Sequence, residues 1–488
     1  MRRSDRAATP TATPASPAST PSSAPRTRAA STRWKSSRSS AEGPPSSHIP
    51  ALIQAARFAL RPLRLLEGEW KRNGDVFAIR FPFFGKIVYV AEPSAVRDVI
   101  TGDPHRFHAG EGNAGPLEPV LGQNSLLTLD GDEHMAQRKL LLPPFHGERI
   151  RRYADAMREA AEREVAGWPL GRPFPLRPAM QRITLEVILR TIFGVNDPAR
   201  RARFSDLTTR LDRVSTPVMW IPALRHDLGP LSPWRRFLKV RAEADELIYE
   251  EIGRRRAEPG FERRDDVLSL LLQARHEDGA PMSDMELRDE LMTLVGAGHE
   301  TTATALCWAF ELMLRHPRVE RRLREEVADG GGDEYLDAVM KETLRLRPVV
   351  VDVVRKLMED TEIAGRMIPA GTYVVAAIAV VHVRPDVYPD PKEFRPERFL
   401  DGQAEPYTWI PFGGGVRRCL GASFAQQEIK VVLRTLLETA RLRPASTRPE
   451  APRARHVTIV PSRGARVVLE ERLRPARVTS SHPFATTS

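Results

Sequence analysis

The segment Phe412–Gly421 holds a cysteine in a setting that suits metal chemistry. It reads Phe-Gly-Gly-Gly-Val-Arg-Arg-Cys-Leu-Gly, and a helix-like run over 422–440 follows at once. A thiol at a helix start lies near backbone N–H groups and the positive end of the helix dipole, which stabilise a thiolate. Arg417 and Arg418 add positive charge, and the glycines let the backbone pass close to a large flat group. A single anionic sulfur in this position points to haem iron rather than zinc.

Two simpler roles are open to a cysteine or a loop of this kind. A lone cysteine after a turn is usually an inert core residue, and a glycine-rich loop before a helix can cradle a phosphate. No strand-like run leads directly into the loop, and the spacing G-x-x-x-x-G-K-[ST] is absent. The whole pattern F-x-x-G-x-R-x-C-x-G instead resembles the haem-binding loop of the cytochrome P-450 family. The specified positions are Phe412, Gly415, Arg417, Cys419 and Gly421.

This resemblance implies a mainly α fold, with a helical haem-binding domain and one small β-rich region. The implied cofactor is haem b (iron protoporphyrin IX), with Cys419 as its metal ligand. Phe412, Gly413, Arg417 and Gly421 of the same loop are expected to contact the cofactor. The implied activity is that of a haem-thiolate monooxygenase of the soluble bacterial type. Such an enzyme uses O₂ and two electrons from NAD(P)H.

Three more residues match positions at which this family binds the haem propionates. His134 and Arg138 are spaced i, i+4, so they share one face of a predicted helix. Alone, such a pair is usually an exposed polar face. The resemblance assigns both to the propionates, together with Arg355, because a pair of carboxylates needs such donors.

A long helix is predicted from Ser283 to His316. Ser283 and Glu286 form a capping box at its start, and Pro317 stops it. Gly296 and Gly298 lie in its interior, where each glycine costs about 1 kcal/mol. We interpret this cost as room for a cofactor or O₂ beside the backbone, at a point where the helix can open to hold water.

The stretch 297–302 of this helix, Ala-Gly-His-Glu-Thr-Thr, resembles the family's oxygen-activation motif, [AG]-G-x-[DE]-T-[TS]. The resemblance implies that Ala297 and Gly298 contact the cofactor. It also implies that Glu300 and Thr301 deliver protons to bound dioxygen.

A further motif, Glu342-Thr-Leu-Arg345, lies on a predicted helix over 333–346. An i, i+3 pair of this kind is usually a solvated surface bridge worth a few tenths of a kcal/mol. In the resembling family the pair is buried and joined by a second arginine, which Arg398 matches here. We therefore expect Glu342, Arg345 and Arg398 to form a structural network behind the cysteine loop. His382 is expected to be structural and Cys307 to be a packing residue.

Composition divides the 488 residues into three parts. Residues 1–49 are rich in Ser, Thr, Pro, Ala and Arg without hydrophobic periodicity, which predicts a disordered N-terminal tail. An organelle transit peptide is the alternative for this tail. A single cytochrome P-450 domain is expected over 50–473, and a disordered C-terminal tail over 474–488.

The net charge of +11 belongs to the ends of the chain. Residues 1–49 carry +6 and residues 441–488 carry +7, which leaves −2 for the body between them. A nucleic-acid binder would carry a basic face on its folded body, so we expect no nucleic-acid partner. No apolar run reaches the length of a membrane span. With two cysteines and no membrane anchor expected, a cytoplasmic location is predicted.

The remaining patterns predict local elements. Strands are expected at 76–80 and 86–90, an irregular loop at 105–125, and helices at 150–165, 180–193, 198–213 and 234–256. Prolines between 217 and 233 are expected to separate the last two helices. The stretch 457–469, with a turn at 461–464, is predicted to form a hairpin.

The resemblance also bounds the partners. A lipophilic substrate such as a fatty acid, terpenoid or polyketide is expected to be hydroxylated or epoxidised. Electrons would come from a ferredoxin or similar donor with an NAD(P)H-dependent reductase. Two alternatives stay open, a haem-thiolate peroxygenase and a non-enzymatic haem sensor or carrier. Neither alternative needs an acidic residue followed by a threonine. This sequence has that pair in Glu300 and Thr301, which argues against both.

Overall fold

The computed structural model describes residues 43–473 apart from 48, 146, 228, 230, 331, 401 and 403. The predicted tails lie outside the described residues, except for 43–47 and 49. The domain bounds of 50 and 473 stay a prediction. Among the residues before 50, the Pro45 carbonyl accepts a hydrogen bond from the backbone N–H of Ala78 at 2.9 Å, and Ser46 bridges to Ala78.

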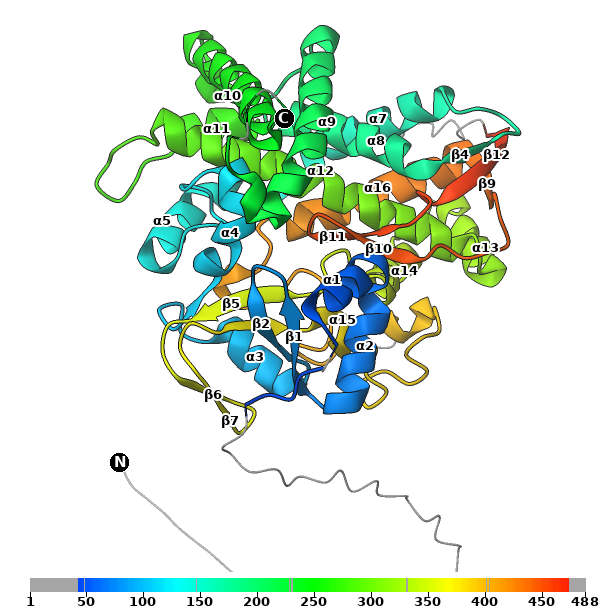
Figure 1. The fold of residues 1–488 in the computed structure, drawn as a ribbon. Helices are drawn as coiled ribbons and strands as arrows, with labels where there is room; N and C mark the ends of the chain where they lie inside the picture. The colour runs from blue at the N-terminus through cyan, green and yellow to red at the C-terminus, as the bar shows by residue number, and fades with distance from the viewer. Residues whose placement is uncertain are drawn as a thin grey trace, which may run out of the picture. The chain divides into compact units, whose positions relative to one another are not determined.

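Helices form most of the described chain (Figure 1). They are α1 (Ala51–Leu60), α2 (Pro62–Asn73), α3 (Pro93–Thr101), α4 (Ala109–Leu121), α5 (Gly131–Leu141), α6 (Glu148–Arg152), α7 (Ala154–Ala166), α8 (Leu176–Thr191), α9 (Pro198–Trp220), α10 (Pro233–Ala257), α11 (Val267–Gln273), α12 (Asp284–Met313), α13 (Pro317–Ala328), α14 (Glu334–Leu346), α15 (Ile378–Val381) and α16 (Ala422–Thr439).

The strands are short and form small sheets. They are β1 (Val76–Phe81), β2 (Gly85–Val90), β3 (Phe107–His108), β4 (Pro173–Pro175), β5 (Val353–Leu357), β6 (Thr361–Ile363), β7 (Arg366–Ile368), β8 (Tyr373–Ala376), β9 (Ala440–Pro444), β10 (Pro452–Arg455), β11 (Thr458–Pro461) and β12 (Arg466–Arg472). The largest sheet has the order β1-β2-β8-β5-β3. The predicted mainly α fold with a small β-rich region is confirmed.

The predicted strand pair at 76–90 is confirmed. β1 and β2 are antiparallel, with Val76 opposite Val90 and Phe81 opposite Gly85. β2 then pairs in parallel with β8, and β8 pairs with β5, the strand that carries Arg355. The small sheet therefore links the N-terminal hairpin to a strand with a predicted cofactor residue.

Helix α12 forms as predicted. The hydroxyl of Ser283 accepts a hydrogen bond from the Glu286 N–H, and the Glu286 carboxylate accepts one from the Ser283 N–H. The helix then continues without a break through Gly296 and Gly298 to Met313. It packs against α8, α10, α14 and α16.

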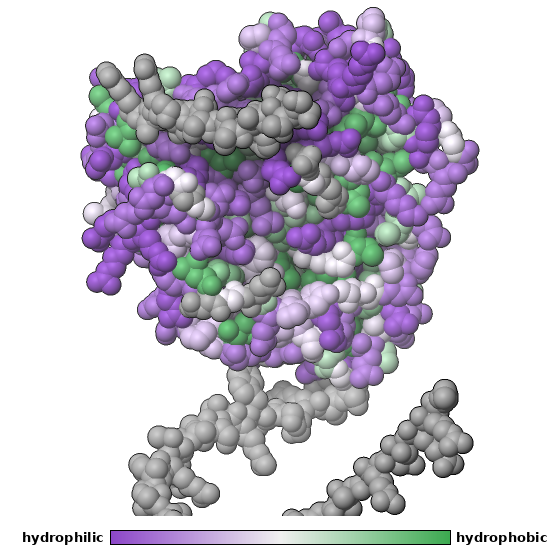
Figure 2. Space-filling view, turned by 180° about the vertical axis from the view of Figure 1, so that it is seen from behind, coloured by the Kyte–Doolittle hydropathy of each residue, from purple (hydrophilic) through white to green (hydrophobic). Residues whose placement is uncertain are grey.

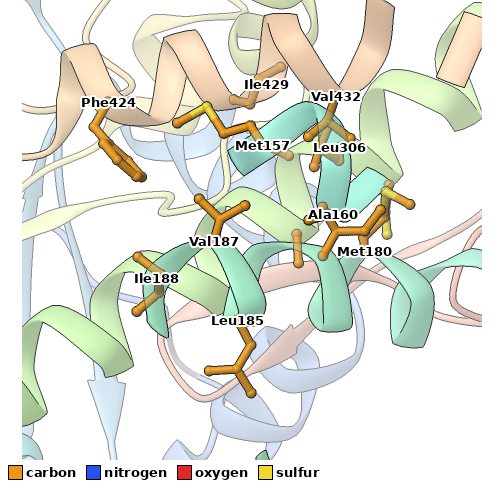
Figure 3. Packing of buried hydrophobic residues seen from close by; sticks show 14 of the residues in the cluster. Met157, Ala160, Met180, Leu185, Val187, Ile188, Leu306, Phe424, Ile429 and Val432 are labelled. Carbon is orange, nitrogen blue, oxygen red and sulfur yellow. The ribbon is translucent and has the colours of Figure 1, made fainter. Parts of the chain in front are cut away.

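The largest hydrophobic cluster joins the cysteine-proximal helix to the long helix. Figure 3 shows Phe424, Ile429 and Val432 of α16 facing Met157 of α7 and Leu306 of α12. All five are at most 5% exposed. Burial of side chains of this size stabilises the fold by about 1.5–3 kcal/mol each. The helix that follows the cysteine loop is thus held on a rigid base.

Three local predictions are wrong. The expected loop at 105–125 contains α4, although Pro116 and Pro119 lie inside that helix. Its first N–H groups, those of Gly110 and Glu111, donate to the Asp130 carboxylate at 2.8 Å each, which caps a sequence of poor helix formers. Helix α9 also runs on past Pro217 to Trp220, because Pro removes only one hydrogen bond there.

The third error is the C-terminal hairpin. A turn does lie at 461–464, where the Gly464 N–H donates to the Pro461 carbonyl at 3.0 Å. The strands on its two sides nevertheless separate. β11 pairs with β10, whereas β12 pairs with β4 and β9. A turn signal indicates a chain reversal but does not select the strand's partner.

The molecular surface is mostly hydrophilic on the face shown in Figure 2, with hydrophobic residues in separate small patches. Among the residues that the structure describes, none of the helices is both long and apolar enough to cross a membrane.

Candidate functional site

The cysteine loop is a tight turn held by its own backbone. The Cys419 N–H donates to the Phe412 carbonyl at 2.9 Å, and Phe412 is half-buried. Gly415 has φ = 60°, and a Cβ atom there would lie 2.6 Å from the Ile100 carbonyl oxygen. Only glycine fits this close approach to α3. Gly421 then occupies the N-cap position of α16, so the thiol lies just ahead of a helix start, as predicted.

The thiol of Cys419 combines accessibility with dense surroundings. Its side chain is exposed, yet burial among protein atoms raises its pKa, while the Gly421 N–H, Arg418 and Arg138 act to lower it. Cys307, by contrast, is fully buried in the core, and burial raises its thiol pKa. The Cys419 thiol is therefore open to contact with a bound group.

A cluster of positive charge lies beside this loop. Its members are the side chains of His134 and Arg138 on α5, Arg355 on β5, and Arg417 of the loop. Arg417 donates to an Asp130 carboxylate oxygen at 2.6 Å and to the Leu126 carbonyl at 3.1 Å. The structure thus brings together all four residues that sequence reasoning assigned to the propionates and the loop.

The pKa values in this cluster show an excess of cations. Burial, with Arg417, Arg138 and Arg355 nearby, lowers the pKa of His134 to about 3, so its imidazole is neutral. Burial and the nearby Arg417 lower the pKa of Arg355 to about 10, although Asp130 opposes this. Burial likewise lowers the pKa of Arg417 to about 10, although Asp130 opposes this. Among the described residues, one carboxylate of this region, that of Asp130, pairs with a guanidinium of the cluster, that of Arg417.

This donor set fits a buried group that carries two carboxylates. An anion would offset the cost of holding Arg355 and Arg417 in a poorly solvated site. An accessible cysteine thiol at a helix start lies next to them. The residues present therefore fit a haem, whose iron takes a thiolate and whose propionates take arginine and histidine donors.

The charge of Arg417 does not act on the thiol as expected, and its contact with the cofactor stays a prediction. Sequence reasoning placed its charge beside the thiol, but its guanidinium binds Asp130. Arg138 and Arg418 act on the sulfur instead. Arg138 also donates to the Arg418 carbonyl at 2.8 Å, which ties α5 to the cysteine loop.

The predicted network of Glu342, Arg345 and Arg398 is present. Both side chains of the Glu342–Arg345 pair are 0% exposed, with two parallel hydrogen bonds of 2.6 and 2.8 Å. Arg398 Nε donates to Glu342 Oε1 at 3.0 Å. Arg345 also donates to the carbonyls of His382 and Pro391, at 2.7 and 2.8 Å. These bonds pin irregular backbone to α14.

Two contacts extend this network to the cysteine loop. The buried His382 accepts a hydrogen bond on Nε2 from the Ile410 N–H at 2.9 Å. Burial lowers the pKa of His382 to about 3, which keeps Nε2 free to accept. Trp409 donates from its indole to the Lys341 carbonyl at 3.1 Å. The segment that enters the loop is thereby held at two adjacent residues, by α14 at Trp409 and by His382 at Ile410.

On α12, Glu300 is buried and held by α8. Its carboxylate forms an ion pair with Arg177 and accepts a hydrogen bond from Gln181 Nε2 at 2.6 Å. The half-buried Thr301 donates to the Ala297 carbonyl at 2.6 Å. The two side chains are adjacent in sequence but have different partners.

Gly298 has a structural reason to be small. A Cβ atom there would lie 2.6 Å from Ile188 Cδ1 on α8, too close for real side chains. The glycine thus allows α8 and α12 to pack closely. Contact of Ala297 and Gly298 with a cofactor stays a prediction.

Sequence reasoning missed three acidic or basic partners, Asp130, Arg177 and Glu290. Glu290 on α12 is fully buried and accepts a hydrogen bond from the Leu126 N–H at 2.8 Å. The Leu126 carbonyl in turn accepts from Arg417. Each partner lies more than a hundred residues from the group that it binds. No local pattern could identify such pairs.

The chain matches the family model described as Cytochrome P450, here written cytochrome P-450, over residues 67–468. It is 44% identical over 451 residues to cytochrome P-450 135B1 of Mycobacterium tuberculosis, covering 91% of this chain and 94% of that protein. It is 40% identical over 435 residues to cytochrome P-450 138 of the same organism, covering 88% and 96%.

Solved structures have the same fold. The retinoic acid-bound cyanobacterial CYP120A1 superposes with a TM-score of 0.76 at 27% identity, covering 88% of this chain and 99% of that chain. The haem domain of cytochrome P-450DA superposes with a TM-score of 0.77 at 24% identity, covering 88% and 98%.

The buried network predicts a strong effect on stability. Arg345→Ala leaves the buried Glu342 carboxylate with Arg398 and the Arg395 backbone N–H as its donors, and loss of the ion pair costs about 3–5 kcal/mol. We expect little soluble, folded protein, measured by expression yield and thermal melting. Arg322→Ala is the control, because Arg322 pairs with Glu397 at an exposed site and such pairs contribute about 0–1 kcal/mol. A melting temperature of Arg345→Ala equal to that of the control would contradict the structural role.

Glu290 predicts a pH dependence of stability. Burial raises its pKa from 4.5 to about 8, so the folded protein retains a proton that the unfolded chain releases. The free energy of unfolding from this group therefore falls as pH rises from about 4.5 to about 8. Glu290→Gln removes the ionisation, so its melting temperature should fall less than that of the wild type over this range. The exposed Glu277→Gln is the control and should follow the wild type. Parallel curves for Glu290→Gln and wild type would refute this assignment.

Proposed function

This chain belongs to the cytochrome P-450 family and is a haem monooxygenase, and on that premise we propose that it hydroxylates or epoxidises a lipophilic substrate with haem b. The observation that carries the proposal is the accessible Cys419 thiol beside a cluster of three buried or half-buried arginines and a neutral histidine.

Haem binding is assigned to residues on three segments, which are α5, β5 and the cysteine loop. Cys419 is proposed as the iron ligand, and His134, Arg138, Arg355 and Arg417 as the donors to the propionates. A bound haem with a thiolate ligand supplies reductive activation of O₂. The residues of this chain orient the group, neutralise its carboxylates and restrict water around the sulfur.

Proton delivery is assigned to Glu300 and Thr301. The hydroxyl of Thr301 donates to Ala297 and keeps its lone pairs free to accept a hydrogen bond from water. Glu300 is held by Arg177 and Gln181. To move a proton, Glu300 must exchange one of these bonds for a bond to water. The acid–alcohol pair therefore needs a small rearrangement on α8 or α12.

A lipophilic substrate is the class that we propose, such as a fatty acid, terpenoid or polyketide. The similar CYP120A1 is described as bound to retinoic acid, which is a lipophilic molecule. Electrons are proposed to come from a ferredoxin or similar donor with an NAD(P)H-dependent reductase. The exposed Arg418 next to the cysteine offers positive charge to an acidic donor. A cytoplasmic location is part of this proposal, since Cys307 and Cys419 are both free thiols.

One comparison separates this function from its two alternatives. Product formation is measured with NADPH plus a surrogate ferredoxin system, and separately with hydrogen peroxide, on a panel of lipophilic compounds that shift the haem spectrum. The proposal expects turnover with NADPH. Turnover with peroxide alone indicates a peroxygenase, and spectral binding without either turnover indicates a sensor or carrier.

Thr301→Ala tests the proton role. The variant should consume NADPH at a similar rate and release most of the electrons as peroxide. Product per NADPH should fall at least about tenfold, because a positioned proton donor contributes roughly 10²–10⁴-fold. Thr301→Ser keeps the hydroxyl and is the matched control. If product per NADPH is unchanged in Thr301→Ala, the hydroxyl only serves the Ala297 carbonyl.

A further inference from the structure

A cavity lies away from the cysteine loop, at the C-terminal ends of α12 and α14. Its volume is about 510 Å³, within the range of roughly 300–1,000 Å³ that small-molecule sites occupy. Its lining includes Trp308, Leu312, Arg315, Leu346, Arg347 and Phe394. The acidic residues Glu311, Glu393 and Glu450 line it as well. Trp308 lies seven residues beyond Thr301 on α12, about 10 Å further along the helix at 1.5 Å per residue. Helices α12 and α14 contact each other.

Arg347 is the unusual group in this cavity. Among the residues that the structure describes, it forms no ion pair with a carboxylate. Its Nη1 donates to the Leu346 carbonyl at 2.9 Å, whereas its Nε is buried and has no acceptor. Its guanidinium carbon lies 5.4 Å from the centre of the Trp308 ring. A partly buried guanidinium whose Nε lacks an acceptor costs stability unless an anion compensates it.

The neighbouring charges do not compensate Arg347. Burial lowers its pKa, Glu311 acts to raise it, and Arg345 lowers it further. Glu311 is already engaged, because it pairs with Arg315 and accepts a hydrogen bond from the Glu450 N–H at 2.8 Å. Glu450 itself binds Arg463. Among the described cations that line the cavity, Arg347 is therefore the one without a carboxylate partner whose buried Nε has no acceptor.

The apolar part of the lining favours an apolar body for the ligand. Trp308, Leu312, Leu346 and Phe394 are each at most 7% exposed and present apolar surface. A hydrated multivalent anion such as phosphate gains little from these walls and meets the Glu311 carboxylate. A single carboxylate on an apolar body satisfies both the guanidinium and the walls.

We propose that this cavity binds a small organic monocarboxylate, with Arg347 holding the carboxylate and the apolar walls holding the rest. The site is distinct from the haem region and stands whether or not the proposed substrate class is correct.

Isothermal titration of the haem-loaded full chain with benzoate tests the proposal, at constant ionic strength. We expect a Kd of about 1 mM, or about −4.1 kcal/mol. Benzamide, the neutral analogue, should bind at least tenfold more weakly. Arg347→Gln should also lose at least tenfold in benzoate affinity. Arg318→Gln, which removes an exposed arginine outside the cavity, should stay within about twofold.

Several results would overturn the proposal. They are absence of benzoate binding up to about 50 times the expected Kd, equal binding by Arg347→Gln, and tighter binding of inorganic phosphate than of benzoate. The haem spectrum is recorded in parallel, and benzoate binding that shifts it equally in wild type and Arg347→Gln places the ligand at the haem instead. If Arg347→Gln does not fold, Leu312→Trp, which fills the cavity, must give the same loss of binding.

Discussion

The buried ion pair between Glu342 and Arg345 is the interaction on which the cysteine region depends. Two charges at zero exposure are costly to desolvate, so the pair persists only because its other donors and acceptors are used. Arg398 takes a third bond to Glu342, and Arg345 binds the carbonyls of His382 and Pro391. Irregular backbone cannot satisfy its own carbonyls, and this guanidinium does it for them.

The Glu342–Arg345 pair is connected to the cysteine loop through a short series of hydrogen bonds. His382 accepts a hydrogen bond from the Ile410 N–H, and the Trp409 indole donates one to the Lys341 carbonyl of α14. The loop then turns over Gly415 and closes where Cys419 binds the Phe412 carbonyl. On the far side, α16 packs into the main hydrophobic cluster (Figure 3). The thiol position is therefore defined by ionic contacts before it and by apolar packing after it. The cluster around Arg355 and Arg417 has an excess of positive charge, which a group with two carboxylates would neutralise.

The features that depend on residues close together in the sequence were predicted correctly. The capping box at Ser283, the strand pair around Phe83 and the spacing of His134 and Arg138 depend on residues a few positions apart, and all three formed as expected. The pairing of β12 and the hold of Arg177 on Glu300 depend on segments that meet only in the folded chain. Family resemblance supplied the long-range Glu342–Arg398 contact, which no periodicity could have shown. The sequence suggests room for a cofactor at Gly298, and the structure adds the close approach of Ile188.

The proposed ligation of iron by Cys419 can be measured directly by iron K-edge X-ray absorption of the haem-loaded protein. The chain has two cysteines, so Cys307→Ser and Cys419→Ser form a matched pair. We expect one sulfur neighbour at the iron in the wild type and in Cys307→Ser, and none in Cys419→Ser. A sulfur neighbour that persists in Cys419→Ser, or is missing from the wild type, would contradict the thiolate site.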